Sequence, residues 1–456
     1  MADVTSLLEE IVPTDRLLAG DAAEDYTHDE ALGGQPQTPA CVVFPISTDE
    51  VSAILRVANE HGVAVTARGS GTGLSGAAIP VAGGLVVSFE RMNRIIEIDA
   101  ENQVAVVEPG VTLAQLEEAT AGHGLVYPVF PGEYSASIGG NVGTNAGGMR
   151  AVKYGVTRHQ VLGLEAVLAS GEVIRTGGRF VKGSTGYDLT QLVVGSEGTL
   201  ALVTEAILKL YPRLPHQATV MAPFRTLEDV MRAVPRIVGS GIGPLILEYI
   251  DMLTLAGMER NFGLELGVPE AVRAEALAYL VVMMENRIEA RLDEDVLTLS
   301  EQLVDLGAVD VYVLPPQAGV ALISAREKAF WLAKSSGADD IVDVAVPRAA
   351  IADFMEQVAA LAAATGTFVA GCGHAGDGNV HLSVFQPDGV KRSGVLHDLF
   401  AVGMELGGVI SGEHGIGTTK KKYFLELEDP VKIDLMRSIK RAFDPTNILN
   451  PGTLFD

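Results

Sequence analysis

Cysteine, aromatic residues and positive charge are all scarce in this sequence. Cys41 and Cys372 are its only cysteines, too few for a disulfide framework in 456 residues, so we expect reduced thiols and a cytoplasmic location. Lys and Arg total 33 against 58 Asp and Glu, which leaves a net charge of −25 at pH 7. Because nucleic-acid binding depends on Lys and Arg that neutralise phosphates, this balance excludes nucleic acid as a partner.

Long apolar runs are missing as well. No stretch reaches the roughly 18 uncharged apolar residues that a transmembrane helix needs. The N-terminus, MADVTSLLEEIVPTDRLL, has neither the basic start nor the long apolar core of a signal peptide. The sequence therefore predicts a soluble protein without an integral membrane segment, and it leaves peripheral attachment to a membrane open.

Glycine, by contrast, is abundant, with 51 residues, and it gathers in a few loops. Up to about residue 212, short strands, glycine loops and a few helices alternate. After LYPRLP (210–215), long helical patterns alternate with strands, which is typical of helices packed on one face of an antiparallel sheet. We expect an α+β protein with domains over 1–215 and 216–425, and a C-terminal helix and tail over 426–456 that returns to the first domain.

Two helices near the N-terminus follow from apolar spacing and capping residues. Leu7, Leu8, Ile11 and Leu17 stand at helical spacing and predict a helix over residues 1–20. A second helix is expected from Thr48 or Asp49, either of which can cap it, to the stop at His61-Gly62.

Three glycine clusters fall within the first 200 residues. Residues 71–76, GTGLSG, match the GxGxxG pattern, but the next ordered element is predicted as a strand, so the required context of a dinucleotide-binding βαβ unit is absent. Residues 131–148 and 195–200 hold the other two clusters. Successive backbone N–H groups in such turns can bind phosphate, and three clusters together favour an extended nucleotide over ordinary turns.

Histidines gather in two glycine-flanked segments near the C-terminus. His374 and His381 lie in GCGHAGDGNVHLSVF (371–385), where the Gly376–Gly378 turn lets the chain fold back and bring the imidazoles together. Glu413 follows in SGEHGIG (411–417). Two histidines and a carboxylate with an open position are a donor set for a catalytic divalent metal such as zinc. The alternative is that these histidines are ordinary capped or exposed residues.

The glycine segments resemble a known flavoprotein domain. ARGSGTGLSGAA (67–78), PGEYSASIGGNVGTNAGGMRAVKYG (131–155) and VVGSEGTLALVTEA (193–206) are similar to the FAD-binding domain of the vanillyl-alcohol oxidase and p-cresol methylhydroxylase group. The resemblance implies a two-lobed PCMH-type domain with FAD between the lobes and its pyrophosphate on Arg68–Gly76. It implies contacts from these residues: Arg68, Gly69, Ser70, Gly71, Thr72, Gly73, Gly76, Pro131, Ser137, Gly139, Gly140, Asn145, Gly147, Gly148, Glu197, Gly198 and Asn450. Thr72 stands where some members carry the histidine that attaches the flavin, which implies non-covalent FAD.

The histidine segments resemble the C-terminal domain of the FAD-linked D-2-hydroxyacid dehydrogenases. That family includes flavin-type D-lactate dehydrogenases, D-2-hydroxyglutarate dehydrogenase and the flavin subunit of bacterial glycolate oxidase. The resemblance implies that His374, His381 and Glu413 bind Zn²⁺ or another divalent metal such as Mn²⁺. It also implies that His414 is the catalytic base and that Arg326 binds the substrate carboxylate.

The substrate and the partners are less defined by the resemblance. Ile341 stands where D-2-hydroxyglutarate dehydrogenase has a lysine for the distal carboxylate, which favours D-lactate or glycolate, with Lys334 and Arg348 as substitute cations. We expect a small 2-hydroxyacid as substrate and an electron acceptor whose identity stays open. Whether the protein forms a homodimer or binds partner subunits also stays open.

Three other functions stay open at this point. A metal-dependent hydrolase could use the same His₂Glu set, although it has no use for three glycine clusters. A flavin-binding subunit of a glycolate oxidase-type complex would be inactive alone. A phenol or aryl-alcohol oxidase of the same superfamily would need an aromatic site, and aromatic residues are only 5% of this chain.

Overall fold

The structure is a computed structural model that describes residues 4–455. They form two compact units, each built from separate stretches of chain. The first unit joins Met1–Ala146, Val156–Arg213 and Glu413–Asp456, and the second joins Gly147–Gly155 and Leu214–Gly412. The C-terminal segment thus belongs to the same unit as the N-terminal one.

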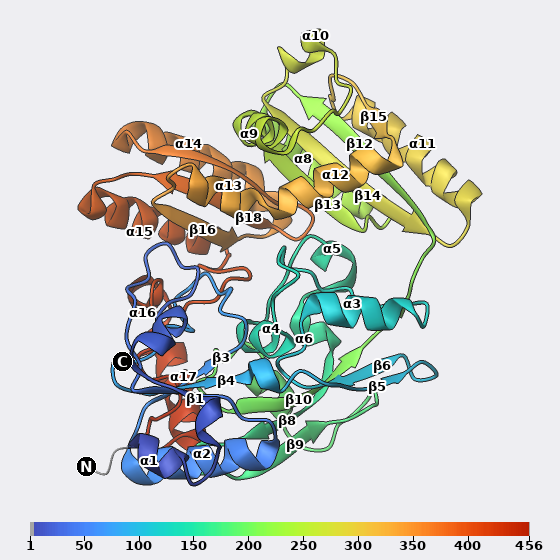
Figure 1. Cartoon of the computed structure of the whole chain (residues 1–456). Helices are drawn as coiled ribbons and strands as arrows, with labels where there is room; N and C mark the ends of the chain where they lie inside the picture. The colour runs from blue at the N-terminus through green and yellow to red at the C-terminus, as the bar shows by residue number, and fades with distance from the viewer. Residues whose placement is uncertain (1–3, 456) are drawn as a thin grey trace. The chain divides into compact units, whose positions relative to one another are not determined.

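The first unit contains a four-stranded sheet with the order β1-β2-β4-β3 (Figure 1). Its strands are β1 (Leu17–Leu18), β2 (Cys41–Val43), β3 (Val65–Arg68) and β4 (Leu85–Ser88). β2 and β3 both run parallel to β4, and α2 (Thr48–His61) connects them. The apolar face of α2, with Val51, Ile54 and Leu55, joins a core that also contains Val65 and Leu449 from the C-terminal tail.

A five-stranded antiparallel sheet with the order β5-β6-β10-β8-β9 forms the other lobe of this unit. Its strands are β5 (Ile95–Asp99), β6 (Val104–Val107), β8 (Val161–Val167), β9 (Val173–Gly177) and β10 (Leu202–Lys209). Leu113 and Leu116 of α3 (Leu113–Ala121) and Ile138 and Val142 of α4 (Ile138–Thr144) pack in the core of this lobe.

The remaining helices and strands complete the first unit. They are α1 (Val4–Leu8), η1 (Thr14–Arg16), η2 (Gly20–Tyr26), η3 (Phe89–Arg91), β7 (Leu125–Val126), α6 (Thr157–Gln160), α7 (Leu189–Val193), β11 (Tyr211–Pro212), α16 (Lys421–Leu427) and α17 (Pro430–Phe443). The loop from β3 to β4 contains no helix, so the structure confirms that GTGLSG does not open a dinucleotide-binding βαβ unit.

The predicted helix over residues 1–20 is wrong. Residues 1–3 lie outside the described residues, and α1 ends at Leu8. Pro13 lacks the N–H that a continuing helix needs, and Leu17 of β1 pairs with Val43 of β2. The predicted caps of α2 are also wrong, because Ser47 accepts the N–H of Glu50 at 3.3 Å. Gly62 ends this helix as predicted, with φ 62°.

A seven-stranded antiparallel sheet forms the centre of the second unit, with the order β15-β12-β14-β13-β17-β18-β16 (Figure 1). The strands are β12 (His216–Phe224), β13 (Ile246–Asp251), β14 (Ala278–Asn286), β15 (Tyr312–Leu314), β16 (Asp340–Ala345), β17 (Phe368–His374) and β18 (Asn379–Phe385). Residues 278–284 of β14 are all buried, although successive side chains point to opposite faces. Both faces of the sheet are therefore covered, and the prediction of helices on one face only is wrong.

Long and short helices surround this sheet. They are α5 (Ala151–Tyr154), α8 (Leu227–Gly239), α9 (Met252–Phe262), α10 (Glu270–Arg273), α11 (Glu289–Asp305), α12 (Pro316–Glu327), α13 (Ala329–Ser335), η4 (Arg348–Ala350), α14 (Ile351–Thr365) and α15 (Gly389–Glu405). Leu255 of α9 and Leu322 of α12 pack against Tyr279 and Val281 of β14. Within residues 4–455, no helix has the length and apolar character needed to cross a membrane.

Candidate functional site

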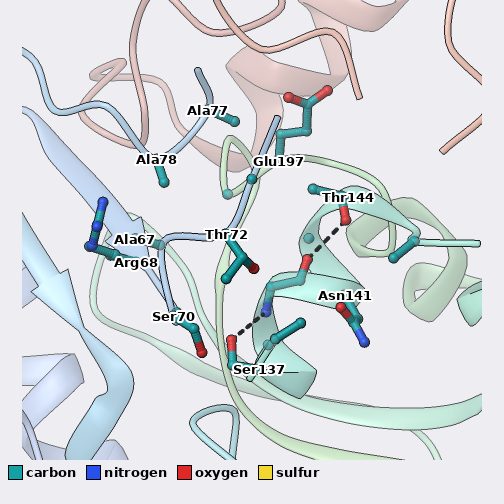
Figure 2. Close-up of a pocket in the computed structure, with 18 of the residues that line it drawn as sticks. Ala67, Arg68, Ser70, Thr72, Ala77, Ala78, Ser137, Asn141, Thr144 and Glu197 are labelled. Carbon is teal, nitrogen blue, oxygen red and sulfur yellow. Dashed lines mark hydrogen bonds between the residues drawn. The ribbon is translucent and has the colours of Figure 1, made fainter. Parts of the chain in front are cut away.

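The three glycine clusters line one pocket of the first unit (Figure 2). The pocket encloses about 1270 Å³ of empty space, its open mouth included. Its wall comes mainly from residues 67–78, 131–146 and 193–203, together with Glu413 and His414. Because three separate segments of chain line it, the pocket suits an extended ligand.

The loop after β3 brings backbone to the pocket wall. Gly71 and Gly76 have φ of 73° and 81°, in the left-handed region that favours glycine. A Cβ on Gly69 would lie 1.9 Å from Oγ of Ser137, the residue that caps α4, so loop and helix meet more closely than a side chain would allow. Glycine-rich backbone of this kind can offer N–H groups to a phosphate.

Three glycines lie inside α4, where helix propensity argues against glycine. Ser137 accepts the N–H of Gly140 at 3.2 Å (Figure 2). A Cβ on Gly139 would lie 2.6 Å from the side chain of Pro109, which explains that glycine. Apart from its chain neighbours and the backbone of its own helix, a Cβ on Gly143 would have no atom within 4 Å, yet Gly143 lines the pocket. The space beside Gly143 is thus available to a ligand, and the pocket fits FAD.

Glu197 holds the segment that follows His414. Its backbone has φ 51°, and its buried carboxylate accepts the N–H groups of Ile416 and Gly417, both at 2.8 Å. Burial raises the pKa of Glu197 to about 7 against the opposing effect of these two hydrogen bonds. Glu197 and His414 line the same pocket, so this carboxylate fixes backbone next to the predicted base.

Most of the predicted cofactor residues line this pocket. They are Arg68, Gly69, Ser70, Gly71, Thr72, Gly73, Pro131, Ser137, Gly139, Gly140, Glu197 and Gly198. The guanidinium of Arg68 donates to the carbonyl oxygens of His28 at 2.6 Å and Asp25 at 3.0 Å, so its side chain supports the neighbouring segment.

Five predicted cofactor residues do not line the pocket: Gly76, Asn145, Gly147, Gly148 and Asn450. Asn145 ends α4, and Gly147 and Gly148 belong to the second unit. Asn450 supports the pocket wall indirectly. Its side-chain amide donates to the carbonyl oxygens of two lining residues, Ala77 and Glu197, both at 2.8 Å.

The pocket also has lining residues that sequence reasoning missed. Asn141, Gly143 and Thr144 of α4 belong to it, as do Ser75 and Ser196. All five lie within the same glycine-rich segments, and that position was the only signal in the sequence.

His374 and His381 meet in the second unit. They lie on β17 and β18, which pair as an antiparallel hairpin, and their ring centroids are 4.9 Å apart with planes at 73°. The chain thus folds back and brings the two imidazoles together as the sequence predicted. That they bind a metal remains a prediction.

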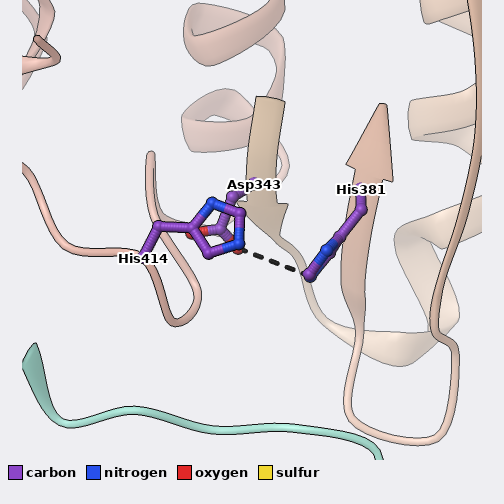
Figure 3. A group of neighbouring side chains, drawn as sticks. All are labelled: Asp343, His381 and His414. Atoms are coloured by element: carbon purple, nitrogen blue, oxygen red, sulfur yellow. Dashed lines mark ion pairs between the residues drawn. The ribbon is translucent and has the colours of Figure 1, made fainter. Parts of the chain in front are cut away.

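Each imidazole has a polar partner that sequence reasoning missed. Nδ1 of His374 lies 2.6 Å from Oε1 of Glu248, and Nε2 of His381 lies 2.7 Å from Oδ1 of Asn379. Buried Asp343 accepts the amide of Asn379 at 2.8 Å and lies 3.8 Å from His381 (Figure 3). Polar partners of this kind orient the histidines of metal sites. Ser411 adds a further contact, because its hydroxyl donates to Asp343 at 2.7 Å.

The three predicted substrate cations of the second unit lie in different surroundings. Arg326, in the last turn of α12, is 5% exposed and pairs with Glu248 at 2.8 Å. Lys334 is exposed on α13 and lies over the rings of Phe330 and Trp331. Arg348 is exposed and donates to the carbonyl oxygen of Gly376. Arg326 and His374 share one partner, because both contact Glu248.

Two protein-family models match this chain, one over its N-terminal part and one over its C-terminal part. Residues 39–177 match the family model described as FAD binding domain, and residues 213–454 match the model described as FAD linked oxidases, C-terminal domain. The second match alone spans more than half of the chain.

Similar proteins match over nearly the whole length. An uncharacterized FAD-linked oxidoreductase of Mycobacterium tuberculosis is 59% identical and covers 100% of this chain and 99% of its own. A D-lactate dehydrogenase of Archaeoglobus fulgidus is 41% identical over 90% of each chain. A glycolate oxidase subunit GlcD of Bacillus subtilis is 40% identical, over 94% of this chain and 92% of its own.

A solved structure supports the fold. Substrate-bound p-cresol methylhydroxylase has a TM-score of 0.78 at 19% identity and covers 99% of this chain and 96% of its own. The predicted fold class, a PCMH-type domain with an antiparallel-sheet-and-helix domain, is confirmed.

Proposed function

We propose that this chain, which belongs to the FAD-linked oxidase family, oxidises a small D-2-hydroxyacid to the 2-oxoacid. D-Lactate and glycolate are favoured over D-2-hydroxyglutarate. The relatives named D-lactate dehydrogenase and glycolate oxidase subunit support this substrate class. FAD, held non-covalently in the pocket of the first unit, would supply the acceptor for the hydride that leaves the substrate's α-carbon.

The observation that carries this proposal is the position of His414 on the wall of the pocket that fits FAD. Imidazole is suited to take a hydroxyl proton near neutral pH, and we assign His414 as the general base. The two hydrogen bonds from Ile416 and Gly417 to Glu197 hold the backbone two and three residues further on. That anchorage limits the movement of the imidazole relative to the pocket wall.

His374, His381 and Glu413 would hold a divalent cation, Zn²⁺ or another such as Mn²⁺. A pair of imidazoles and one carboxylate is a donor set of catalytic zinc sites. When bound, this cation would act as a Lewis acid on the substrate hydroxyl. The contacts of Glu248 with His374 and of Asn379 with His381 support this assignment, since metal-bound histidines usually have such a polar partner at one ring nitrogen.

Arg326 would bind the substrate carboxylate, since a guanidinium matches a carboxylate in charge and geometry. The side chain of Ile341 is half-buried on β16, opposite Ser383, and offers no charge for a second carboxylate. This apolar side chain supports the preference for D-lactate and glycolate, and the exposed Lys334 and Arg348 are the remaining candidates to bind a longer acid.

An anaerobic visible spectrum of the purified holoprotein tests the proposal directly. D-Lactate, glycolate and D-2-hydroxyglutarate are added separately, and we expect D-lactate or glycolate to bleach the flavin. His414→Ala should slow the bleaching by a factor of about 100 or more, the usual contribution of a general base. The control, His123→Ala, removes an exposed histidine of the same unit that does not line the pocket. Normal bleaching of the His414→Ala flavin would contradict the assignment of the base.

A second function is favoured by one specific finding, the relative named as a subunit of glycolate oxidase. A subunit of such a complex would bind FAD but stay yellow with every hydroxyacid until its partner subunits were added. A colourless protein that fails to take up FAD would refute both functions.

A further inference from the structure

One carboxylate in the second unit contacts both a predicted cation ligand and the predicted substrate arginine. Oε1 of Glu248 lies 2.6 Å from Nδ1 of His374, and Oε2 lies 2.8 Å from Nη2 of Arg326. We propose that Glu248 is a positioning residue that fixes the tautomer of His374 and the direction of the Arg326 guanidinium. The role of Glu248 in cation and substrate binding rests on the proposed function. Its effect on the tautomer of His374 is a property of the second unit alone.

The sheet places Glu248 opposite His374. β13 and β17 pair antiparallel, with Tyr249 opposite Gly373 and Ile250 opposite Cys372. Glu248 and His374 are the next residues on the two strands, and their side chains are in contact. Directly opposed residues of antiparallel strands have Cβ atoms about 4.5–5.5 Å apart, near enough for a hydrogen bond between these side chains. The contact therefore depends on the pairing of two central strands and not on a mobile loop.

The hydrogen bond decides which nitrogen of His374 is available to a cation. A carboxylate oxygen beside a guanidinium accepts hydrogen bonds, so Nδ1 of His374 carries the hydrogen and donates it. In the neutral ring, Nε2 then carries the lone pair. Metal-bound histidines usually donate their second ring N–H to a carboxylate or carbonyl in this way.

The other oxygen of Glu248 compensates the charge of Arg326. The side chains of Glu248 and Arg326 are 0% and 7% exposed, and a guanidinium stays protonated even when buried. A buried cation that loses its anion is strongly destabilising, so this carboxylate stabilises the guanidinium of Arg326 in the folded second unit.

Replacing Glu248 by Gln changes both contacts while preserving shape. A glutamine has only one accepting oxygen, and the guanidinium of Arg326 can do nothing but donate. With that oxygen turned to Arg326, the amide NH₂ faces Nδ1 of His374, which must then accept. The hydrogen of the neutral imidazole moves to Nε2, the nitrogen needed by a cation.

Histidine nitrogen NMR of the ¹⁵N-labelled full chain, freed of metal, tests the tautomer. His374→Asn identifies the His374 signals by their disappearance. We expect the Nδ1–H form in the wild type and the Nε2–H form in Glu248→Gln. The wild-type measurement alone is decisive even if Glu248→Gln does not fold, because an Nε2–H tautomer for His374 would overturn the proposal.

Zn²⁺ binding, measured by titration calorimetry on the same metal-free protein, tests the consequence. Loss of such a polar partner commonly weakens metal affinity by about 10–100-fold, and we expect a loss in this range for Glu248→Gln. Glu285→Gln is the matched control, since it removes a carboxylate of β14 that is 8% exposed and paired with Lys153 at 2.8 Å. The control should bind Zn²⁺ as the wild type does.

The outcomes separate this inference from the proposed function. Equal Zn²⁺ affinity in wild type and Glu248→Gln would overturn the positioning role while leaving the oxidation of hydroxyacids intact. A wild type that binds no Zn²⁺ would refute the metal assignment, and the tautomer of His374 would then decide the role of Glu248. In the active enzyme, Glu248→Gln should also raise the KM for the hydroxyacid through Arg326, whereas Glu285→Gln should not.

Discussion

Gly143 offers a test of where the flavin nucleotide binds, because its two expected effects have opposite signs. In Gly143→Ala, the new methyl group meets no atom within 4 Å outside its chain neighbours and its own helix backbone, and it stands beside the pocket of the first unit. Gly143 lies within α4 and its φ is not positive, so alanine fits the backbone. The variant should fold at least as well as the wild type.

The two magnitudes follow from the same methyl group. Replacing a glycine inside a helix by alanine stabilises the fold by about 0.5–1 kcal/mol. A methyl group forced into a closely packed contact costs about 1–3 kcal/mol, which would weaken FAD binding by roughly 5- to 150-fold. Apoprotein stability should therefore rise while FAD affinity falls.

Two measurements on flavin-free protein separate these effects. Urea unfolding gives the stability, and titration with FAD, followed by quenching of flavin fluorescence, gives the dissociation constant. Gly394→Ala is the matched control, because Gly394 is exposed within α15 of the second unit and its Cβ would also meet no atom. The control should gain similar stability and keep wild-type FAD affinity. Wild-type affinity in Gly143→Ala would refute the argument that α4 faces the nucleotide.

Three further predictions concern the first unit. The pKa of buried Glu197 is raised to about 7, so the folded apoprotein keeps a proton that the unfolded chain releases from about pH 4.5 upward. Its stability should thus fall by about 3 kcal/mol from pH 4.5 to 7, and parallel unfolding profiles of wild type and Glu197→Gln over this range would contradict that. Lys440→Met removes the buried cation that contacts Asp444 and two carbonyl oxygens, and should cost about 3–5 kcal/mol in urea unfolding; a loss below 1 kcal/mol would show that the pair is dispensable. Acid precipitation should release all flavin into the supernatant because Thr72 offers no ring nitrogen for attachment, and a yellow pellet would indicate a covalent bond elsewhere.

The fold class could be predicted because local signals and segment order agree. Helix α2 has an apolar stripe, a glycine stop and a capping residue within one position of the predicted cap. The N-terminal segment was mispredicted because its apolar spacing fits a helix, while the partner of Leu17 is a strand 26 residues further along the chain. Pairing between distant strands outweighs local periodicity there, and the sequence carries no local sign of it.

In the candidate site too, local sequence patterns were more informative than single residue types. Residues 69–73 are consecutive in sequence, as are residues 139 and 140. The structure places both of these predicted segments on the wall of one pocket. Lys334 and Arg348 were chosen by charge alone, and the structure leaves both exposed. A charge in the sequence does not reveal whether its side chain faces a buried cluster, since that depends on how the helix or turn that carries it is packed.

The buried carboxylates Glu197 and Glu248 show what a motif search leaves out. Glu197 lies 219 residues from its hydrogen-bond partner Ile416, and Glu248 lies 126 residues from His374. Neither spacing forms a recognisable motif, yet each carboxylate lies beside a group to which the proposed function gives a role. Glu197 binds the backbone that follows His414, and Glu248 contacts His374. A buried carboxylate is costly unless donors surround it, so each one must be explained by what donates to it. In this chain the donors are backbone next to His414 in one case and the imidazole of His374 in the other. The supporting roles of Glu197 and Glu248 therefore follow from their donors in the folded chain, which the spacing of motifs does not reveal.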